Sequence, residues 1–345
     1  MDLNNDLLAK SGIEDLTDFK PVFLYSGGFM QTVLGPILGM LVKSVDLHNE
    51  IMDFEDGGKI CLSWYYDKNR TKGIVCILPG LTSDTKEFYV KNTINAAVEN
   101  GYNAVVVNHR GCNGVKIETP KMYWAASSWD FREAVHYIHK KYPHEKLYGI
   151  GYSLGANILA KYCGEDGEKC ILDGATCVSS PFDMPTASKY LESTYYGIFT
   201  RFLASNIKNK ILEHKEMIPL VEQKYNICIK DILDKCKTLR DIDDKFTAKV
   251  FGYGNVENYY NSARANKVFE GIKIKVLFIS ALDDPVTGHE CIPKEDFKKN
   301  QNIYLIATHG GGHVCHFYQL FSSKQWFTIP TFKFFDQINS SNKLD

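Results

Sequence analysis

The sequence predicts an α/β fold: a mostly parallel central sheet of about eight strands, with helices on both faces and an inserted helical cap. Two features of the 345 residues lead to this prediction. Short, fully apolar runs alternate with amphipathic segments, and one long helical excursion interrupts the alternation. Parallel strands need crossover connections and are buried on both faces, which explains why their runs are apolar throughout.

Residues 1–46 are predicted to form an N-terminal arm packed on the domain. Residues 21–42 contain no charged side chain, a length sufficient to cross a bilayer. Several glycines and Pro36 interrupt this stretch, which has few of the Leu/Ile/Val runs that favour insertion. We therefore expect a buried arm, with a membrane span or peripheral membrane contact as the alternatives.

The sheet is expected to begin with a hairpin. Two β-type runs, 51–54 and 59–65, flank an Asp56-Gly57 turn. The alternation then continues, with strands expected at 73–78, 103–108, 146–150, 170–178, 273–280 and 302–307, and helices at 84–100, 127–141, from Leu154 onward and at 294–300.

The alternation breaks between residues 181 and 268, where the chain is helical, aromatic and charged. Long connections are usually functional, so we expect this segment to be a cap over an active site. The α/β core would then comprise residues 47–180 and 269–345. Within the cap, Tyr195, Tyr196 and Phe199 are predicted to line an acyl-chain pocket, although aromatic residues at helical spacing are also typical of ordinary core.

The composition argues against several classes of protein. The chain has 40 basic and 41 acidic residues, a net charge of −1, so nothing favours a nucleic-acid partner. The ten cysteines are scattered without a CxxC pair, and the N-terminus lacks the basic and apolar regions of a signal peptide. We expect a cytoplasmic protein with reduced cysteines, membrane-associated if the arm contacts lipid.

One cluster of residues has metal-ligand chemistry: His309, His313, Cys315 and His316. Helical zinc sites need ligands on one face at i and i+4, and the glycines at 310–312 would break such a helix. No other cysteine–histidine cluster completes a tetrahedral site. We expect neither a metal nor a cofactor.

The strongest local motif is Gly151-Tyr152-Ser153-Leu154-Gly155, which lies between a predicted buried strand and a small-residue helix. A serine on such a sharp turn has an exposed hydroxyl, and the flanking glycines let neighbouring backbone approach without a Cβ clash. The N–H groups at the start of the helix favour developing negative charge. Ser153 is therefore the candidate nucleophile.

A serine nucleophile needs a base, and the base needs an acid that holds its tautomer. Asp283 and Asp284 follow the predicted strand 273–280, and His313 follows the strand 302–307, the expected order after the serine. We favour Asp284 because Pro285 fixes the turn after it, and keep Asp283 as the alternative acid. His313 is favoured over His309 and His316 because three glycines precede it.

An oxyanion hole is predicted from two backbone N–H groups. The first belongs to Leu81, in the turn Pro79-Gly80-Leu81-Thr82 after the strand 73–78. The second belongs to Leu154, directly after the nucleophile. An ordinary Pro-Gly turn is the alternative at the first position.

With these motifs in order, the sequence resembles the α/β hydrolases and, more narrowly, their YheT-like group. The resemblance covers most of the chain outside the cap and is carried by GGFMQTVLGPIL (27–38), LPGLTSD (78–84), NHRGCNG (108–114), GYSLGANILAKYCGEDG (151–167), SSPFDM (179–184), ALDDPV (281–286) and GGGHVCHF (310–317). It implies a Ser–Asp–His triad and esterase, acylglycerol lipase or phospholipase activity. It also implies that Gln31 and Thr32 belong to the folded domain, and we expect no membrane anchor before them.

The sequence thus predicts a serine hydrolase that cleaves carboxylic esters, with a small-molecule ester or lipid as substrate. Thioester or amide hydrolysis by the same residues is one alternative. A non-catalytic lipid- or steroid-binding protein on the same fold is another, because a fold does not fix a function.

Overall fold

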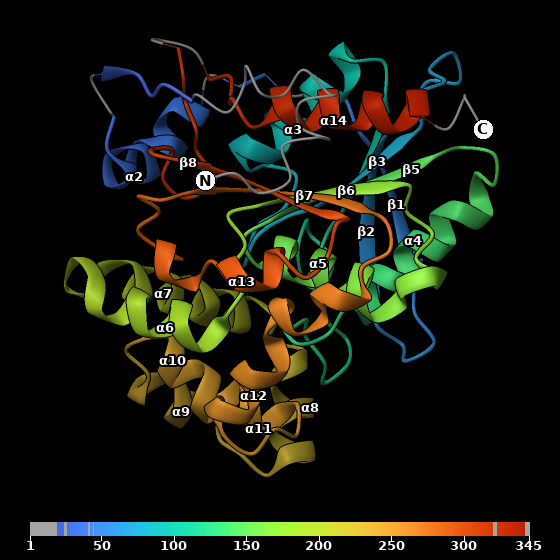
Figure 1. Ribbon diagram of the computed structural model, residues 1–345. Helices are drawn as coiled ribbons and strands as arrows, with labels where there is room; N and C mark the ends of the chain where they lie inside the picture. Colours follow the sequence, from blue (N-terminus) through green and yellow to red (C-terminus); the bar gives the residue numbers. More distant parts are fainter. Residues whose placement is uncertain (1–18, 24–25, 41, 44, 320–322, 342–345) are drawn as a thin grey trace.

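The computed structural model describes residues 19–341 except 24, 25, 41, 44 and 320–322. Its centre is one sheet with strand order β1-β2-β4-β3-β5-β6-β7-β8 (Figure 1). The strand β2 pairs antiparallel with both of its neighbours, β1 and β4, and all other neighbouring strands pair parallel. The strands are β1 (His48–Asp53), β2 (Lys59–Tyr65), β3 (Ile74–Leu78), β4 (Asn103–Val107), β5 (Leu147–Tyr152), β6 (Gly174–Val178), β7 (Lys275–Ala281) and β8 (Ile303–Thr308). The predicted α/β class and the predicted hairpin are confirmed.

Helices cover both faces of the sheet. The helices α3 (Phe88–Glu99) and α14 (Thr328–Ser341) lie on one face, and α4 (Trp129–Lys141) and α5 (Leu154–Asp166) on the other (Figure 1). The predicted helix at 84–100 begins only at Phe88, because Asp84 accepts hydrogen bonds from the N–H groups of Lys86 and Glu87 in a preceding turn.

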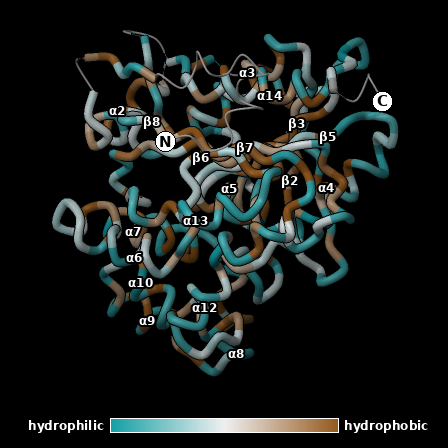
Figure 2. Tube along the Cα trace, viewed as in Figure 1, coloured by the Kyte–Doolittle hydropathy of each residue, from teal (hydrophilic) through white to brown (hydrophobic). Residues whose placement is uncertain are grey.

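The central strands are buried on both faces, as their apolar runs predict. In β3, Ile74, Cys76 and Leu78 belong to the core beneath α4 and α5, whereas Val75 and Ile77 belong to the core beneath α3 and α14. This division follows from the alternation of side chains along a strand. Figure 2 shows the hydrophobic segments running through the strands in the middle of the molecule.

Between β6 and β7 the described chain forms helices and no strand, and these helices lie on one side of the molecule (Figure 1). They contribute most of a separate hydrophobic cluster that includes Ile211, Val221, Leu233 and Phe246. The elements are α6 (Met184–Ser193), η4 (Thr194–Gly197), α7 (Ile198–Glu213), α8 (Met217–Tyr225), α9 (Ile229–Lys235), α10 (Leu239–Ile242), η5 (Asp243–Thr247), α11 (Ala248–Val250), α12 (Val256–Ala263) and η6 (Ala265–Gly271). Three further short helices lie elsewhere in the chain. The first, η3 (Gly167–Lys169), follows α5, and two others, η7 (His289–Cys291) and α13 (Lys294–Phe297), follow β7.

The uncharged N-terminal stretch contains a 12-residue helix, α2 (Gly28–Gly39). Its buried glycines allow close packing on the domain: a Cβ at Gly39 would lie 2.2 Å from the Phe88 Cβ. No helix among the described residues has the length and hydrophobicity needed to cross a bilayer. The part of the predicted arm before residue 19 lies outside the described residues.

Candidate active site

Ser153 occupies a strained turn between β5 and α5. Its φ of 51° and ψ of −116° are rarely adopted by a residue with a Cβ. The two glycines of the motif are required by close contacts. A Cβ at Gly155 would lie 2.3 Å from the Leu78 carbonyl oxygen, and a Cβ at Gly151 would lie 2.6 Å from that of Gly155. The motif therefore folds into the sharp strand-to-helix turn that its glycines predict.

The structure brings Ser153 and His313 together although 160 residues separate them. His313 lies in the loop after β8, and its Nε2 is 2.9 Å from the Ser153 Oγ. The other ring nitrogen, Nδ1, is 2.8 Å from Asp284 Oδ2. In this chain of contacts the imidazole can accept the serine proton while the carboxylate fixes the ring.

Asp284 follows β7 and is 1% exposed. Its second oxygen, Oδ1, accepts hydrogen bonds from the N–H groups of Val286 (2.8 Å) and Thr287 (3.1 Å). Burial opposes ionisation, but His313 and these two N–H groups outweigh it and hold the pKa of Asp284 below its ordinary value. Asp284 therefore faces His313 as a carboxylate.

The neighbouring Asp283 has a different partner. Its Oδ1 accepts a 3.0 Å hydrogen bond from the Gly312 N–H, one residue before His313. Burial and, secondarily, the Asp284 charge raise the pKa of Asp283. The two adjacent carboxylates thus contact the same loop, Asp284 through the His313 ring and Asp283 through the backbone.

The other histidines near this loop have different environments. His316 is fully buried, its Nε2 lies 3.1 Å from the Thr308 Oγ1, and burial lowers its pKa to about 4. A neutral, buried ring of this kind is a structural residue. His309 and His289 are exposed. Within the described residues, no three His, Cys, Asp or Glu side chains are grouped to hold a metal ion.

The turn at residues 79–83 lies beside Ser153, because a Cβ at Gly80 would be 3.5 Å from the Ser153 Cβ. Three rings hold its backbone, two of them buried and that of Tyr123 half-buried. His109 Nε2 is 2.9 Å from the Pro79 carbonyl oxygen, the Tyr89 hydroxyl accepts from the Gly80 N–H (3.1 Å), and the Tyr123 hydroxyl accepts from the Thr82 N–H (2.7 Å).

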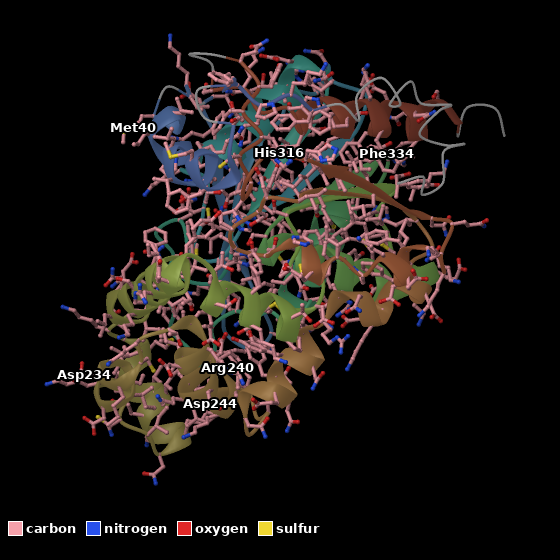
Figure 3. The ribbon with its side chains drawn as sticks, turned by 60° about the vertical axis from the view of Figure 1, so that its left-hand side comes forward. Met40, Asp234, Arg240, Asp244, His316 and Phe334 are labelled. Atoms are coloured by element: carbon pink, nitrogen blue, oxygen red, sulfur yellow. The ribbon has the colours of Figure 1, made fainter. Side chains whose placement is uncertain are left out.

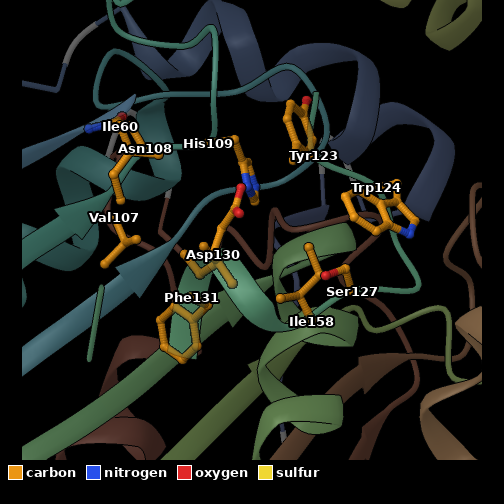
Figure 4. Close-up of a pocket in the computed structure, with 11 residues that line it drawn as sticks. Ile60, Val107, Asn108, His109, Tyr123, Trp124, Ser127, Asp130, Phe131 and Ile158 are labelled. Carbon is orange, nitrogen blue, oxygen red and sulfur yellow. The ribbon is translucent and has the colours of Figure 1, made fainter. Parts of the chain in front are cut away.

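The rings of His109 and Tyr123 stack with centroids 4.2 Å apart (Figure 4). Burial lowers the pKa of His109 to about 4, so the ring is neutral at pH 7 and donates to the Pro79 carbonyl. The Ser83 N–H donates to the Gly80 carbonyl. Leu81 therefore carries the one N–H of residues 79–83 without an acceptor among the described residues. The Leu154 N–H also lacks an acceptor among the described residues, because Leu154 is the first residue of α5 and the first N–H groups of a helix have no partner within it.

The model of the alpha/beta hydrolase fold family matches residues 73–320. The chain belongs to the α/β hydrolases. Among its relatives, mouse phospholipase ABHD3 is 33% identical over 82% of this chain and 69% of its own length. The monoacylglycerol lipase of Saccharomyces cerevisiae is 32% identical over 76% of this chain and 59% of its own.

The putative esterase YheT of Escherichia coli is 26% identical over 86% of both chains, in agreement with the predicted YheT-like group. Among solved structures, an esterase from Pyrococcus furiosus shares the fold with a TM-score of 0.55 at 16% identity, covering 85% of this chain and 91% of its own.

In this α/β hydrolase, a largely apolar cavity of about 80 Å³ lies between the core and the helices after β6. Leu81 and Leu154 line it on one side, and Ile207 and Ile211 of α7 line it on another. The aromatic residues predicted to line an acyl pocket are not among its lining residues. Tyr196 is 92% exposed, and the rings of Tyr195 and Phe199 contact Phe29 instead.

Two site-supporting residues come from the N-terminal arm and were not identified by residue chemistry alone. The Thr32 Oγ1 accepts a 2.9 Å hydrogen bond from the His313 N–H. The Gln31 side chain, which is fully buried, exchanges two hydrogen bonds with the Phe317 backbone. The sequence signal that could have indicated them is the presence of two polar residues in an uncharged stretch, within the motif at 27–38 that carries the family resemblance.

Proposed function

We propose that this α/β hydrolase cleaves carboxylic esters of lipids, with Ser153 as nucleophile, His313 as general base and Asp284 as the acid. The hydrogen-bond chain Ser153 Oγ–His313 Nε2 and His313 Nδ1–Asp284 Oδ2, at 2.9 and 2.8 Å, carries the proposal. A buried carboxylate with a lowered pKa suits the third position, because it stabilises the imidazolium that forms in the reaction.

The proposed reaction has two halves. The Ser153 Oγ attacks the ester carbonyl carbon while its proton moves to His313 Nε2, and the N–H groups of Leu81 and Leu154 stabilise the oxyanion. His313 then protonates the departing alkoxide, which leaves an acyl-serine ester. Water attacks this ester as His313 accepts a proton, and the collapse returns the serine hydroxyl and releases a carboxylic acid.

The proposed substrates are acylglycerols or phospholipids. The cavity beside Leu81 and Leu154 is walled largely by apolar side chains, which suit an acyl chain. Relatives named phospholipase and monoacylglycerol lipase support the same substrate class.

Labelling by a fluorophosphonate probe tests the nucleophile. Ser153→Ala should abolish labelling, because the probe needs an activated hydroxyl. Ser340→Ala is the matched control, since Ser340 is an exposed serine of α14, and it should label like the original protein. Labelling that survived Ser153→Ala would reject the assignment.

A panel of oxygen esters, thioesters and amides of graded acyl length tests the reaction class. We expect turnover of oxygen esters to exceed that of matched thioesters and amides. The reverse order would assign the site to thioester or amide hydrolysis. Tight lipid binding without turnover or labelling would identify a non-catalytic binding protein.

A further inference from the structure

Exposed hydrophobic side chains gather on one surface of the molecule. Of the thirteen large hydrophobic side chains that are exposed in the described residues, nine lie within residues 23–40 or 195–202. We call the surface formed by these two segments the arm–cap face. The exposure is extensive, 81% at Met40 and 60% at Phe202. Contiguous exposed hydrophobic surface of this kind marks an interaction site.

The two segments are distant in sequence and contact each other in the fold. The Phe29 ring of α2 lies 4.7 Å from the Tyr195 ring and 5.7 Å from the Phe199 ring. Figure 1 shows α2 and α7 on the same side of the molecule, and Figure 3 shows Met40 at its outer edge. The arm–cap face is therefore continuous across the junction of the arm and the cap.

The charges around this surface are mostly basic. Residues 21–42 carry no charge, and the nearest charged residues at their two ends are Lys20 and Lys43. In the cap segment Arg201 is exposed, and Glu192, the acidic residue before Tyr195, is half-buried. Lys210 is paired with Glu213 and lines the cavity instead. An apolar surface with a basic border matches a membrane that exposes acyl chains beneath anionic headgroups.

We propose that the arm–cap face docks on an anionic lipid surface. The inference rests on the proposed function, because a lipid substrate has to be taken from such a surface. The sides of α2 and α7 that face away from the arm–cap face reach the candidate active site. Thr32 of α2 binds the His313 backbone, and Ile207 and Ile211 of α7 line the apolar cavity. Docking there would bring the site and its cavity next to the lipid.

Co-sedimentation with vesicles tests the proposal. We compare phosphatidylcholine vesicles with vesicles that also contain phosphatidylserine, using the original protein and the double variant Ile37→Glu/Met40→Glu. The charges should weaken binding to the anionic vesicles at least tenfold, because each removes apolar burial and adds repulsion. Ile51→Glu is the matched control, an equally exposed isoleucine (53%) on the edge strand β1, and should bind normally.

Turnover of a soluble short-chain ester should be unchanged in both variants, since none of the three residues contacts the site. Equal vesicle binding by the double variant, or no binding by the original protein, would overturn the proposal. A dimer that the double variant dissociates would also overturn it, because a second copy would then cover the face. Vesicle binding by a protein that turns over no ester would reject the proposed function and leave the docking surface standing.

Discussion

At the scale of single residues, the division of labour between Asp283 and Asp284 follows from their positions in one turn. Successive side chains after β7 diverge, so only one carboxylate can reach the His313 ring. Asp284 is held by two backbone N–H groups and faces the imidazole, whereas Asp283 accepts from the Gly312 N–H. Burial opposes the ionisation of both, but His313 and the two N–H groups lower the pKa of Asp284, whereas burial, with the Asp284 charge, raises the pKa of Asp283 against the effect of the Gly312 N–H.

Paired asparagine variants separate the two roles. Asp284→Asn should lower kcat by about 10³–10⁴-fold, because an amide cannot hold His313 in the reactive tautomer. Asp283→Asn should cost less than about tenfold, because the amide oxygen can still accept from Gly312. Steady-state turnover of a soluble ester measures both. Equal losses would contradict the distinction.

The turn that carries the Leu81 N–H depends on Tyr123. Tyr123→Phe keeps the ring stacked on His109 and removes the acceptor for the Thr82 N–H. If the Leu81 N–H is the proposed oxyanion donor, its looser placement should lower kcat by about tenfold, less than the 10²–10³-fold loss of a whole donor, with little change in KM. Tyr66→Phe, at an exposed tyrosine, should behave like the original protein. An unchanged kcat in Tyr123→Phe would exclude this positioning role.

At the scale of elements, the helices after β6 bury a carboxylate. Asp243, at the start of η5, is 7% exposed and accepts a 2.9 Å hydrogen bond from the Tyr260 hydroxyl. Burial raises its pKa to about 7, outweighing the hydrogen bonds and Arg240, which lower it. Because an ordinary aspartate ionises near pH 4, the folded protein retains a proton that the unfolded chain has lost.

This retained proton gives the helical segment a pH dependence. Asp243 stabilises the fold fully below about pH 4, and that contribution is lost as pH rises through about 7. Relative to Asp243→Asn, the free energy of unfolding of the original protein should fall by at most about 1.4 kcal/mol per pH unit in this window. Urea unfolding of both proteins from pH 5 to pH 8 measures the difference, and parallel curves would contradict it.

At the scale of the whole molecule, the helix α2 and the loop after β8 are joined beside the candidate active site. Gln31 of α2 and Phe317, 286 residues later, exchange a 3.2 Å and a 3.0 Å hydrogen bond. Gln325 extends the same connection, because its amide donates to the carbonyl oxygens of Val314 and Cys315 (2.7 Å each). The loop that carries His313 is thus held on one side by Gln31, which is remote in sequence, and on the other by Gln325 of the segment that follows it.

Gln31→Leu should destabilise the protein by about 1–3 kcal/mol for each of the two Phe317 backbone groups that it leaves buried and unpaired. Gln223→Leu, at an exposed glutamine of α8, is the control and should change stability little. Urea denaturation measures both. A Gln31 variant as stable as the control would show that the arm does not hold the loop.

Local sequence was sufficient for most elements and for naming Ser153 and His313 as candidates, but it misplaced the cap residues Tyr195, Tyr196 and Phe199, which do not line the cavity. Apolar runs predicted the strands because burial on both faces leaves no polar positions, and the glycines around Ser153 predicted the sharp turn because a Cβ would clash there. The order of serine, aspartate and histidine along the chain also reflects the order of the strands that carry them.

Only the tertiary structure decided which groups meet. Adjacent aspartates look alike in sequence, and the choice between them depends on where each side chain points across the sheet edge. The contacts of Gln31 with Phe317 and of Tyr123 with Thr82 join distant segments, so no local pattern encodes them. The arm–cap face also depends on the tertiary structure. The sequence determines that its side chains are hydrophobic, whereas their exposure depends on which side of each helix the rest of the chain covers.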